Sequence, residues 1–181
     1  MTIPNLVTLA RLFSVPLVIW LLTANQVAAA FWVFVAAGLS DAVDGFIAKR
    51  FGQSSRLGGY LDPVADKALL VSVYVALAIQ GLIPNWITIL VVSRDLLIVG
   101  GLVLSMAISL TISMRPFLIS KVNTAVQIGG AALALAHSGY ELELGSYQEL
   151  VYYAIAATTI ASGVVYVIHW IRIAASVEGT K

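Results

Sequence analysis

Residues 40–67 read SDAVDGFIAKRFGQSSRLGGYLDPVADK, a polar stretch inside an otherwise very apolar chain. It contains four of the nine acidic residues of the chain, Asp41, Asp44, Asp62 and Asp66, and four of the ten basic ones. One apolar run ends in this stretch and another begins in it. We therefore interpret it as a loop between two helices that carry two aspartates each.

The composition indicates that lipid surrounds the chain. Hydrophobic residues make up 60% of the 181 residues and charged residues 10%, with a mean hydropathy of +0.97, whereas a soluble domain carries about 25% charged residues. So much apolar side chain does not fit into one aqueous core of this size. A net charge of +1 without a basic tail gives no sign of nucleic-acid binding, and the absence of cysteine excludes disulfides and thiolate metal sites.

Six apolar runs are long enough to cross a bilayer, which takes roughly 20 residues. They cover residues 4–23, 27–48, 62–81, 85–108, 118–138 and 148–173. Turn and polar residues separate them, and no long repeat or low-complexity segment is visible. We expect an all-α integral membrane protein of six transmembrane helices, with a single domain over residues 1–181.

The basic residues predict the orientation in the membrane. In a six-helix topology the second and fourth loops share a side with both termini, and the other loops carry no Lys or Arg. That shared side carries Lys49, Arg50, Arg56, Arg115, Arg172 and Lys181. By the positive-inside rule both termini are cytoplasmic. We expect a multi-pass protein of the bacterial inner membrane without a signal peptide, with its four aspartates at the cytoplasmic boundary. The alternative location is an organellar membrane, with the presequence absent.

The spacing of the aspartates points to a metal site. Asp41 and Asp44 are three residues apart, and Asp62 and Asp66 four apart, so each pair lies on one face of its helix. Two carboxylates about 4 Å apart repel by roughly 4 kcal/mol at an effective dielectric constant of 20, so a cluster requires protonation or bound cations. Oxygen ligands favour Mg²⁺, Mn²⁺ or Ca²⁺, and four carboxylates suit a two-metal phosphoryl-transfer site. The alternative is a helix pair with solvated acids.

These residues resemble the motif of the integral-membrane CDP-alcohol phosphotransferase family, D-x2-D-G-x2-A-R-x8-G-x3-D-x3-D. Lys49 replaces the arginine and keeps the charge without the bidentate geometry. IPNLVTLARL at residues 3–12 resembles the first helix of the family, and VSRDLLI at 92–98 and ISKVNTAVQ at 119–127 resemble its CMP-forming cardiolipin synthase branch. The last helix looks like apolar filler. Every spacing of the motif is kept, at Asp41, Asp44, Gly45, Ala48, Lys49, Gly58, Asp62 and Asp66.

The resemblance implies a homodimer with a cavity open to the cytoplasm and the inner leaflet. The four aspartates would hold two divalent metal ions, Mg²⁺ or Mn²⁺, around the pyrophosphate of CDP-diacylglycerol. Asp66 would act as the general base for an acceptor hydroxyl that attacks the β-phosphorus, and CMP would leave. Residues implied to bind the CDP group are Asn5, Thr8, Gly45, Ala48, Lys49 and Gly58. Asn5, Thr8 and Arg11 form one polar stripe, whose alternative role is to reach the membrane interface.

Three basic residues are candidates for binding the acceptor phosphate. Arg94 lies within an apolar run, where a charge is costly and often functional; its alternative is an internal ion pair with Asp95 or with one of the motif acids. Lys121 and Arg115 lie at the start of the fifth run, and their alternative is anchoring to lipid headgroups. An anionic lipid acceptor would require such cations.

The reaction expected from this resemblance is transfer of the phosphatidyl group from CDP-diacylglycerol to phosphatidylglycerol, giving cardiolipin and CMP. The alternative acceptor is glycerol 3-phosphate, which would make the chain a phosphatidylglycerophosphate synthase. A membrane prenyltransferase would need a second Asp-rich motif, and only one is present. An ion transporter would be expected to show internal repeats and a site near the bilayer midplane, which the sequence does not indicate.

Overall fold

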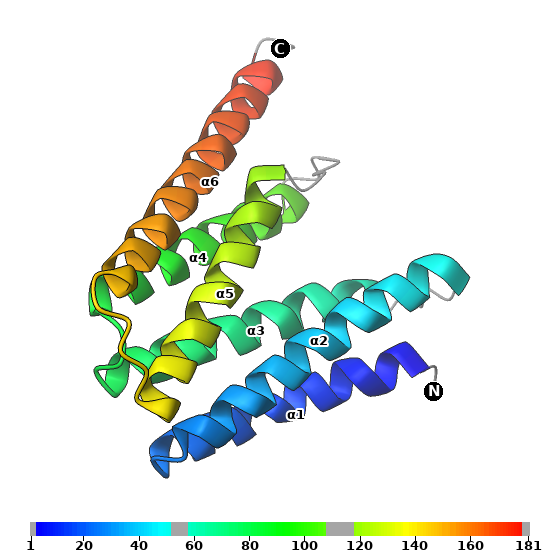
Figure 1. The fold of residues 1–181 in the computed structure, drawn as a ribbon. Coiled ribbons are helices and arrows are strands. Elements are labelled where there is room, and N and C mark those ends of the chain that lie inside the picture. Colours follow the sequence, from blue (N-terminus) through cyan, green and yellow to red (C-terminus); the bar gives the residue numbers. More distant parts are fainter. Residues whose placement is uncertain (1–2, 52–57, 108–117, 179–181) are drawn as a thin grey trace. The chain divides into compact units, whose positions relative to one another are not determined.

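The structure, a computed structural model, describes the backbone of residues 3–51, 58–107 and 118–178, and the side chains of residues 10–40, 67–101 and 118–172. Within these residues the chain forms α-helices and no strand (Figure 1). Each helix coincides with one of the six predicted apolar runs, with ends that differ by a few residues, so the all-α fold is confirmed. The helices are α1 (Ile3–Thr23), α2 (Val27–Phe51), α3 (Gly58–Ile79), α4 (Asn85–Ala107), α5 (Leu118–Tyr140) and α6 (Tyr147–Glu178).

The helices fall into two compact units. The first contains Met1–Asn85 and Gly129–Gly145, and the second contains Trp86–Ile128 and Ser146–Lys181. The last turns of α5 thus belong to the first unit and its first turns to the second. That residues 1–181 act as a single domain stays a prediction.

In the first unit α1 packs against both α2 and α3, and the three helices run side by side (Figure 1). Its core includes Leu22 of α1 and Tyr74 and Leu77 of α3, which are buried almost completely. The amide Nε2 of Gln80 donates a hydrogen bond to the carbonyl oxygen of Leu22. This bond ties the end of α3 to the end of α1.

Residues with left-handed backbone conformations end α1 and α3, as turn residues commonly do. Asn25, at φ 57°, follows α1, and the amide of Gln26 then donates to the carbonyl of Leu21 at 2.8 Å. Gly81, at φ 70°, follows α3, and its amide donates to the carbonyl of Ala78 at 3.0 Å. The turn after α1 allows α2 to run back beside α1.

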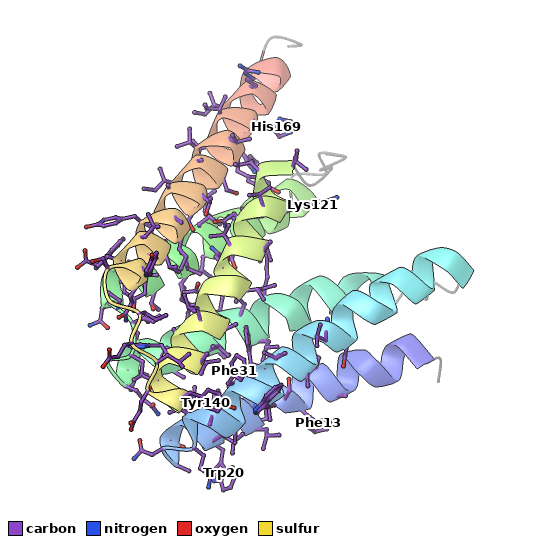
Figure 2. All side chains as sticks on the ribbon, in the orientation of Figure 1. Phe13, Trp20, Phe31, Lys121, Tyr140 and His169 are labelled. Carbon is purple, nitrogen blue, oxygen red and sulfur yellow. The ribbon has the colours of Figure 1, made fainter. Side chains whose placement is uncertain are left out.

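The end of α5 packs closely on the start of α2. A side chain at Gly139 would place its Cβ 2.8 Å from the backbone nitrogen and Cα of Ala28, so only glycine fits there. The indole Nε1 of Trp32 donates to the hydroxyl of Tyr140 at 2.6 Å, and Phe31 meets the Tyr140 ring edge to face with centroids 6.0 Å apart. Figure 2 shows Phe31 and Tyr140 at this contact. Gly139 thus serves helix packing, and α5 continues to Tyr140, two residues past the end of the predicted run 118–138.

The described residues expose many large apolar side chains and bury several polar ones beside an apolar core. Large apolar side chains face outward, among them Phe13 at 71% and Trp20 at 60% exposure, both on the outer side of α1 in Figure 2. Polar side chains lie inside, among them Arg94, Asn123 and Gln127. Buried polar groups and many exposed large apolar side chains are informative departures from the usual pattern. They are the pattern expected when the solvent is lipid.

Two of the described helical segments are long and apolar enough to cross a membrane, Leu118–Tyr140 and Tyr147–Arg172. Shorter apolar helical segments cover Ala10–Thr23, Val27–Ser40 and Lys67–Ile79. The topology of six spans and the cytoplasmic position of both termini stay predictions.

Candidate functional site

The four aspartates lie on two helices of the first unit. Asp41 and Asp44 belong to the last turns of α2, and Asp62 and Asp66 to the first turns of α3. Their side chains lie outside the described residues, but their backbone is helical, so each pair shares one helix face as the spacing predicts. That the two faces oppose each other stays a prediction.

The predicted nucleotide-binding residues lie on three helix ends. Figure 1 shows the first turns of α1, the last turns of α2 and the first turns of α3 at the same end of the first unit. By their positions in these helices, this end carries all ten residues predicted to bind metal or the CDP group. They are Asn5, Thr8, Asp41, Asp44, Gly45, Ala48, Lys49, Gly58, Asp62 and Asp66.

The donor set of this helix end fits divalent metal ions. Each of two helix ends carries two aspartates, and carboxylate oxygens are ligands that Mg²⁺ and Mn²⁺ prefer. Among the residues with described side chains, no group of three His, Cys, Asp or Glu is arranged to hold a metal ion. The four aspartates are not among those residues, so the metal site stays a prediction.

A second polar site lies in the second unit, around Arg94 of α4. Arg94 is only 5% exposed. Its Nη1 donates to Asp95 Oδ1 at 2.6 Å, and its Nη2 donates to Ser120 Oγ of α5 at 2.6 Å. Ser162 Oγ of α6 accepts from both Nε, at 3.2 Å, and Nη2, at 2.6 Å. The guanidinium carbon also lies 5.9 Å from the centre of the Tyr166 ring.

The ion pair between Arg94 and Asp95 was one of the two roles that the sequence left open for Arg94, and it is present. It does not exclude the other role. Ser162 occupies the Nε–Nη2 edge, the edge with which arginine binds an oxyanion through two hydrogen bonds. Because a hydroxyl is uncharged, a phosphate oxygen would form stronger, charge-assisted bonds there. The structure thus shows Arg94 held by one carboxylate and two hydroxyl groups, and its role in binding the acceptor phosphate stays a prediction.

A chain of amide and hydroxyl groups continues this network along α5 and α6. Thr159 Oγ1 donates to Asn123 Oδ1 at 2.9 Å and accepts from Gln127 Nε2 at 3.1 Å. All three side chains are at most 1% exposed. Together with the buried Ser162 and the partly buried Ser120, they form a polar seam along these two helices.

The two other residues predicted to bind the acceptor phosphate are Lys121 and Arg115, and the structure describes only Lys121. Lys121 follows Ser120 in α5 and is exposed, near the start of that helix in Figure 2. Arg115 lies outside the described residues. The structure thus brings Lys121 to the same helix turn as one partner of Arg94.

Sequence reasoning missed Ser120, Thr159 and Ser162. The expectation that the last helix is only apolar filler was wrong, because Thr159 and Ser162 are its contribution to the polar seam. The available signal was spacing: Ser120, Asn123 and Gln127, like Thr159 and Ser162, recur at three or four residues within apolar runs.

A family model, CDP-alcohol phosphatidyltransferase, matches residues 1–176. CDP-diacylglycerol–glycerol-3-phosphate 3-phosphatidyltransferase 1, chloroplastic, of Oryza sativa subsp. japonica is 36% identical over 191 residues, covering 96% of this chain and 58% of the relative. Cardiolipin synthase (CMP-forming) of Rattus norvegicus is 34% identical and covers 91% of this chain and 60% of the relative. A Schizosaccharomyces pombe cardiolipin synthase (CMP-forming) / mitochondrial hydrolase fusion protein is also 34% identical, covering 92% and 31%.

The chain therefore spans about a third to three fifths of the length of these curated relatives. The family match, in contrast, runs from the first residue almost to the last. It includes the stretch of four aspartates and the segments around Arg94 and Lys121. This chain belongs to the CDP-alcohol phosphatidyltransferase family.

Proposed function

We propose that this protein transfers the phosphatidyl group of CDP-diacylglycerol to phosphatidylglycerol, which gives cardiolipin and CMP. The observation that carries the proposal is the complete spaced set of four aspartates on two helix ends of one unit, in a chain of this family. The similarity to cardiolipin synthases from rat and fission yeast supports the choice of acceptor.

In this mechanism Asp66 accepts the proton of the acceptor hydroxyl. The hydroxyl oxygen forms a bond to the β-phosphorus, and the bond from that phosphorus to the oxygen of the CMP phosphate breaks. A primary alcohol is a weak nucleophile near neutral pH, so a positioned carboxylate accelerates the step. Bound divalent cations, two per site and either Mg²⁺ or Mn²⁺, supply charge neutralisation for the pyrophosphate and the leaving CMP.

Asp41, Asp44, Asp62 and Asp66 are the residues proposed to hold these ions. The CDP group is proposed to lie on the same helix ends, against Asn5, Thr8, Gly45, Ala48, Lys49 and Gly58. These ten residues lie at one end of helices α1, α2 and α3, and a nucleotide site formed by helix ends requires such a placement. That placement supports the proposal.

Arg94, Lys121 and Arg115 are proposed to bind the phosphate of the acceptor. Arg94 is supported because its Nε and Nη2, the two atoms that can bind one oxyanion together, donate to the uncharged hydroxyl of Ser162. Lys121 is supported because it is exposed and follows Ser120 in α5. An anionic phosphodiester would gain charge-assisted hydrogen bonds from both.

Glycerol 3-phosphate is the second candidate acceptor, because the plant relative is named for that substrate. We further propose a homodimer in a bacterial inner membrane with its site on the cytoplasmic side. The support for this orientation is the absence of Lys and Arg from the predicted outer loops.

The deciding experiment uses the purified full chain in mixed micelles with CDP-diacylglycerol labelled in its phosphatidyl part. Phosphatidylglycerol or glycerol 3-phosphate is added as acceptor, and the lipid products are separated by thin-layer chromatography. Labelled cardiolipin with phosphatidylglycerol alone supports the proposal. Labelled phosphatidylglycerophosphate with glycerol 3-phosphate alone supports the second candidate, and no CMP release with either acceptor overturns both.

A further inference from the structure

The groups that contact Arg94 differ in how far they are exposed. Asp95, Ser162 and Tyr166 are buried, with at most 5% of their surface exposed, and so is Arg94 itself. Ser120, the partner on α5, is partly exposed. A ligand that approaches this network from outside therefore meets Ser120 before it meets the guanidinium.

The guanidinium has little left to offer a ligand directly. Its Nε and Nη2 donate to Ser162, Nη2 also donates to Ser120, and Nη1 donates to Asp95. These four hydrogen bonds use most of the five N–H groups of an arginine. An anion that binds through Nε and Nη2 would first have to displace Ser162, whose side chain is completely buried.

The hydroxyl of Ser120, in contrast, has a proton to donate. A serine hydroxyl donates one hydrogen bond and is able to accept two. Ser120 Oγ accepts from Arg94 Nη2 at 2.6 Å, and it donates to no group among the residues whose side chains are described. Thr124, one turn later, donates to the carbonyl of Ser120 at 3.0 Å, the common bond of a hydroxyl within a helix. The Ser120 proton is therefore available to an oxygen atom of a ligand.

Arg94 makes Ser120 a stronger donor. A hydroxyl that accepts a hydrogen bond from a cation is polarised by it, and successive hydrogen bonds strengthen one another in a low-dielectric interior. Hydrogen bonds to an ionised partner are also roughly twice as strong as those between neutral groups. An anionic oxygen at Ser120 would thus benefit from the charge of Arg94 without contact with the guanidinium.

The charges around Ser120 favour an anion as the ligand. Asp95 Oδ1 lies 2.6 Å from Arg94 Nη1, so this buried pair is neutral as a whole. Lys121, the next residue after Ser120, is exposed near the start of α5 (Figure 2). Its flexible four-carbon stem allows the ammonium to reach an anion beside Ser120. One positive charge in excess matches the single negative charge of a phosphodiester.

We propose that the Ser120 hydroxyl donates a hydrogen bond to the phosphate of the acceptor lipid, and that Arg94 acts through Ser120 as a positioning residue. This inference rests on the proposed function, because it takes the phosphodiester of phosphatidylglycerol as the ligand. It adds a binding residue that the sequence did not indicate. It also gives Arg94 an effect on the phosphate that leaves the buried Ser162 in place.

The test compares two substitutions at one position in the purified full chain. Ser120→Ala removes the hydroxyl, and Ser120→Thr keeps it. For each variant the KM for phosphatidylglycerol, the KM for CDP-diacylglycerol and kcat are measured in mixed micelles. Thr158→Ala is the matched control, because Thr158 is a partly exposed residue of α6 whose hydroxyl donates to backbone carbonyls of its own helix.

We expect Ser120→Ala to raise the KM for phosphatidylglycerol roughly tenfold, the effect of losing one charge-assisted hydrogen bond. Its kcat and its KM for CDP-diacylglycerol should stay close to those of the parent, and Ser120→Thr and Thr158→Ala should match the parent. An unchanged KM for phosphatidylglycerol, or an equal rise for both substrates, would overturn the proposal. If Ser120→Ala does not fold, as judged by its thermal unfolding, Ser120→Cys makes the same test with a weak donor.

Combining Arg94→Lys with Ser120→Ala tests whether Arg94 acts through Ser120. If it does, the two effects are not independent, and the KM of the double variant for phosphatidylglycerol should exceed the larger single effect by no more than about twofold. A KM equal to the product of the two single effects would overturn this role of Arg94.

Binding is also followed without donor, as the rise in the midpoint of thermal unfolding on addition of one compound. The compounds are phosphatidylglycerol, glycerol 3-phosphate, inorganic phosphate and diacylglycerol, which has no phosphate. Phosphatidylglycerol should stabilise the parent and Ser120→Thr more than Ser120→Ala, and diacylglycerol should not distinguish the three. Stabilisation of the parent by inorganic phosphate or glycerol 3-phosphate as large as that by phosphatidylglycerol would overturn the choice of a lipid.

These measurements separate the two proposals. A parent that binds phosphatidylglycerol but transfers nothing defeats the proposed function and still tests Ser120. A parent that transfers normally, with Ser120→Ala unchanged in both KM values, defeats the role of Ser120 alone.

Discussion

The hydroxyl oxygen of Ser162 accepts two hydrogen bonds from Arg94, from Nε at 3.2 Å and from Nη2 at 2.6 Å. This contact joins α6 to α4, and Ser120 joins α5 to the same guanidinium. One buried cation thus connects three helices of the second unit. The connection depends on hydroxyl groups that sequence patterns alone do not single out.

Ser162→Ala should destabilise the protein by about 1–3 kcal/mol, because it leaves two donors of a buried charged group without their acceptor. For a chain of this length, that lowers the midpoint of thermal unfolding by about 2–4 °C per kcal/mol. Thr158→Ala is the control. Thr158 Oγ1 donates to the backbone carbonyls of Ala154 and Ile155 in its own helix, so its loss should change stability by no more than about 0.5 kcal/mol.

Arg94→Lys should raise the KM for the anionic acceptor, because lysine keeps the charge but presents no bidentate edge. We expect roughly a tenfold increase, the effect of one charge-assisted hydrogen bond. The KM for CDP-diacylglycerol should stay close to that of the parent. An equal rise for both substrates would show that Arg94 acts only through the packing of the second unit.

Gly139→Ala and Gly129→Ala should have opposite effects, although both glycines lie in α5. A Cβ at position 139 would lie 2.8 Å from backbone atoms of Ala28, which are unable to move aside independently, so we expect a loss of about 1–3 kcal/mol. Nothing lies within 4 Å of a Cβ at position 129, so the gain in helix propensity of about 0.5–1 kcal/mol should remain. Thermal unfolding of both variants in one detergent compares them directly, and equal midpoints would contradict the close packing of α5 on α2.

Asp66→Asn should lower kcat by roughly a hundredfold or more, the scale of losing a general base. The amide is close in shape to the carboxyl group, so CDP-diacylglycerol should still bind, as measured by competition with a labelled nucleotide lipid. Turnover equal to that of the parent would remove Asp66 from the mechanism.

Chelation should abolish transfer in the parent, and adding back Mg²⁺ or Mn²⁺ should restore it. The four aspartates offer only hard oxygen ligands, so Mg²⁺ and Mn²⁺ should restore activity better than Zn²⁺, which favours nitrogen and sulfur. Full activity after exhaustive chelation would show that the aspartates act without bound metal ions.

The helix order and the Arg94–Asp95 pair were predictable from the sequence, for separate reasons. Long apolar runs interrupted by turn residues leave little choice but helices in lipid. A cation inside such a run needs a counter-charge, and the next residue is an acid. The positions of the aspartates on the ends of α2 and α3 followed from the same runs.

The partners of Arg94 on α5 and α6 were not predictable, because they depend on how the helices rotate about their axes. A serine in an apolar helix, such as Ser162, most often bonds to its own backbone. Its spacing from Thr159 indicates a polar helix face but does not indicate that its partner lies on α4. Periodicity describes one helix at a time and gives no such pairing.

The many exposed apolar side chains of this chain have a practical consequence for making a water-soluble analogue. The outward residues that would be exchanged for Lys, Glu or Gln, such as Phe13, Trp20 and Leu39, do not belong to the seam around Arg94. The interior already resembles that of a protein with polar networks. Redesign of the exterior alone would therefore carry this seam unchanged into aqueous solution, where ligand titrations no longer compete with detergent.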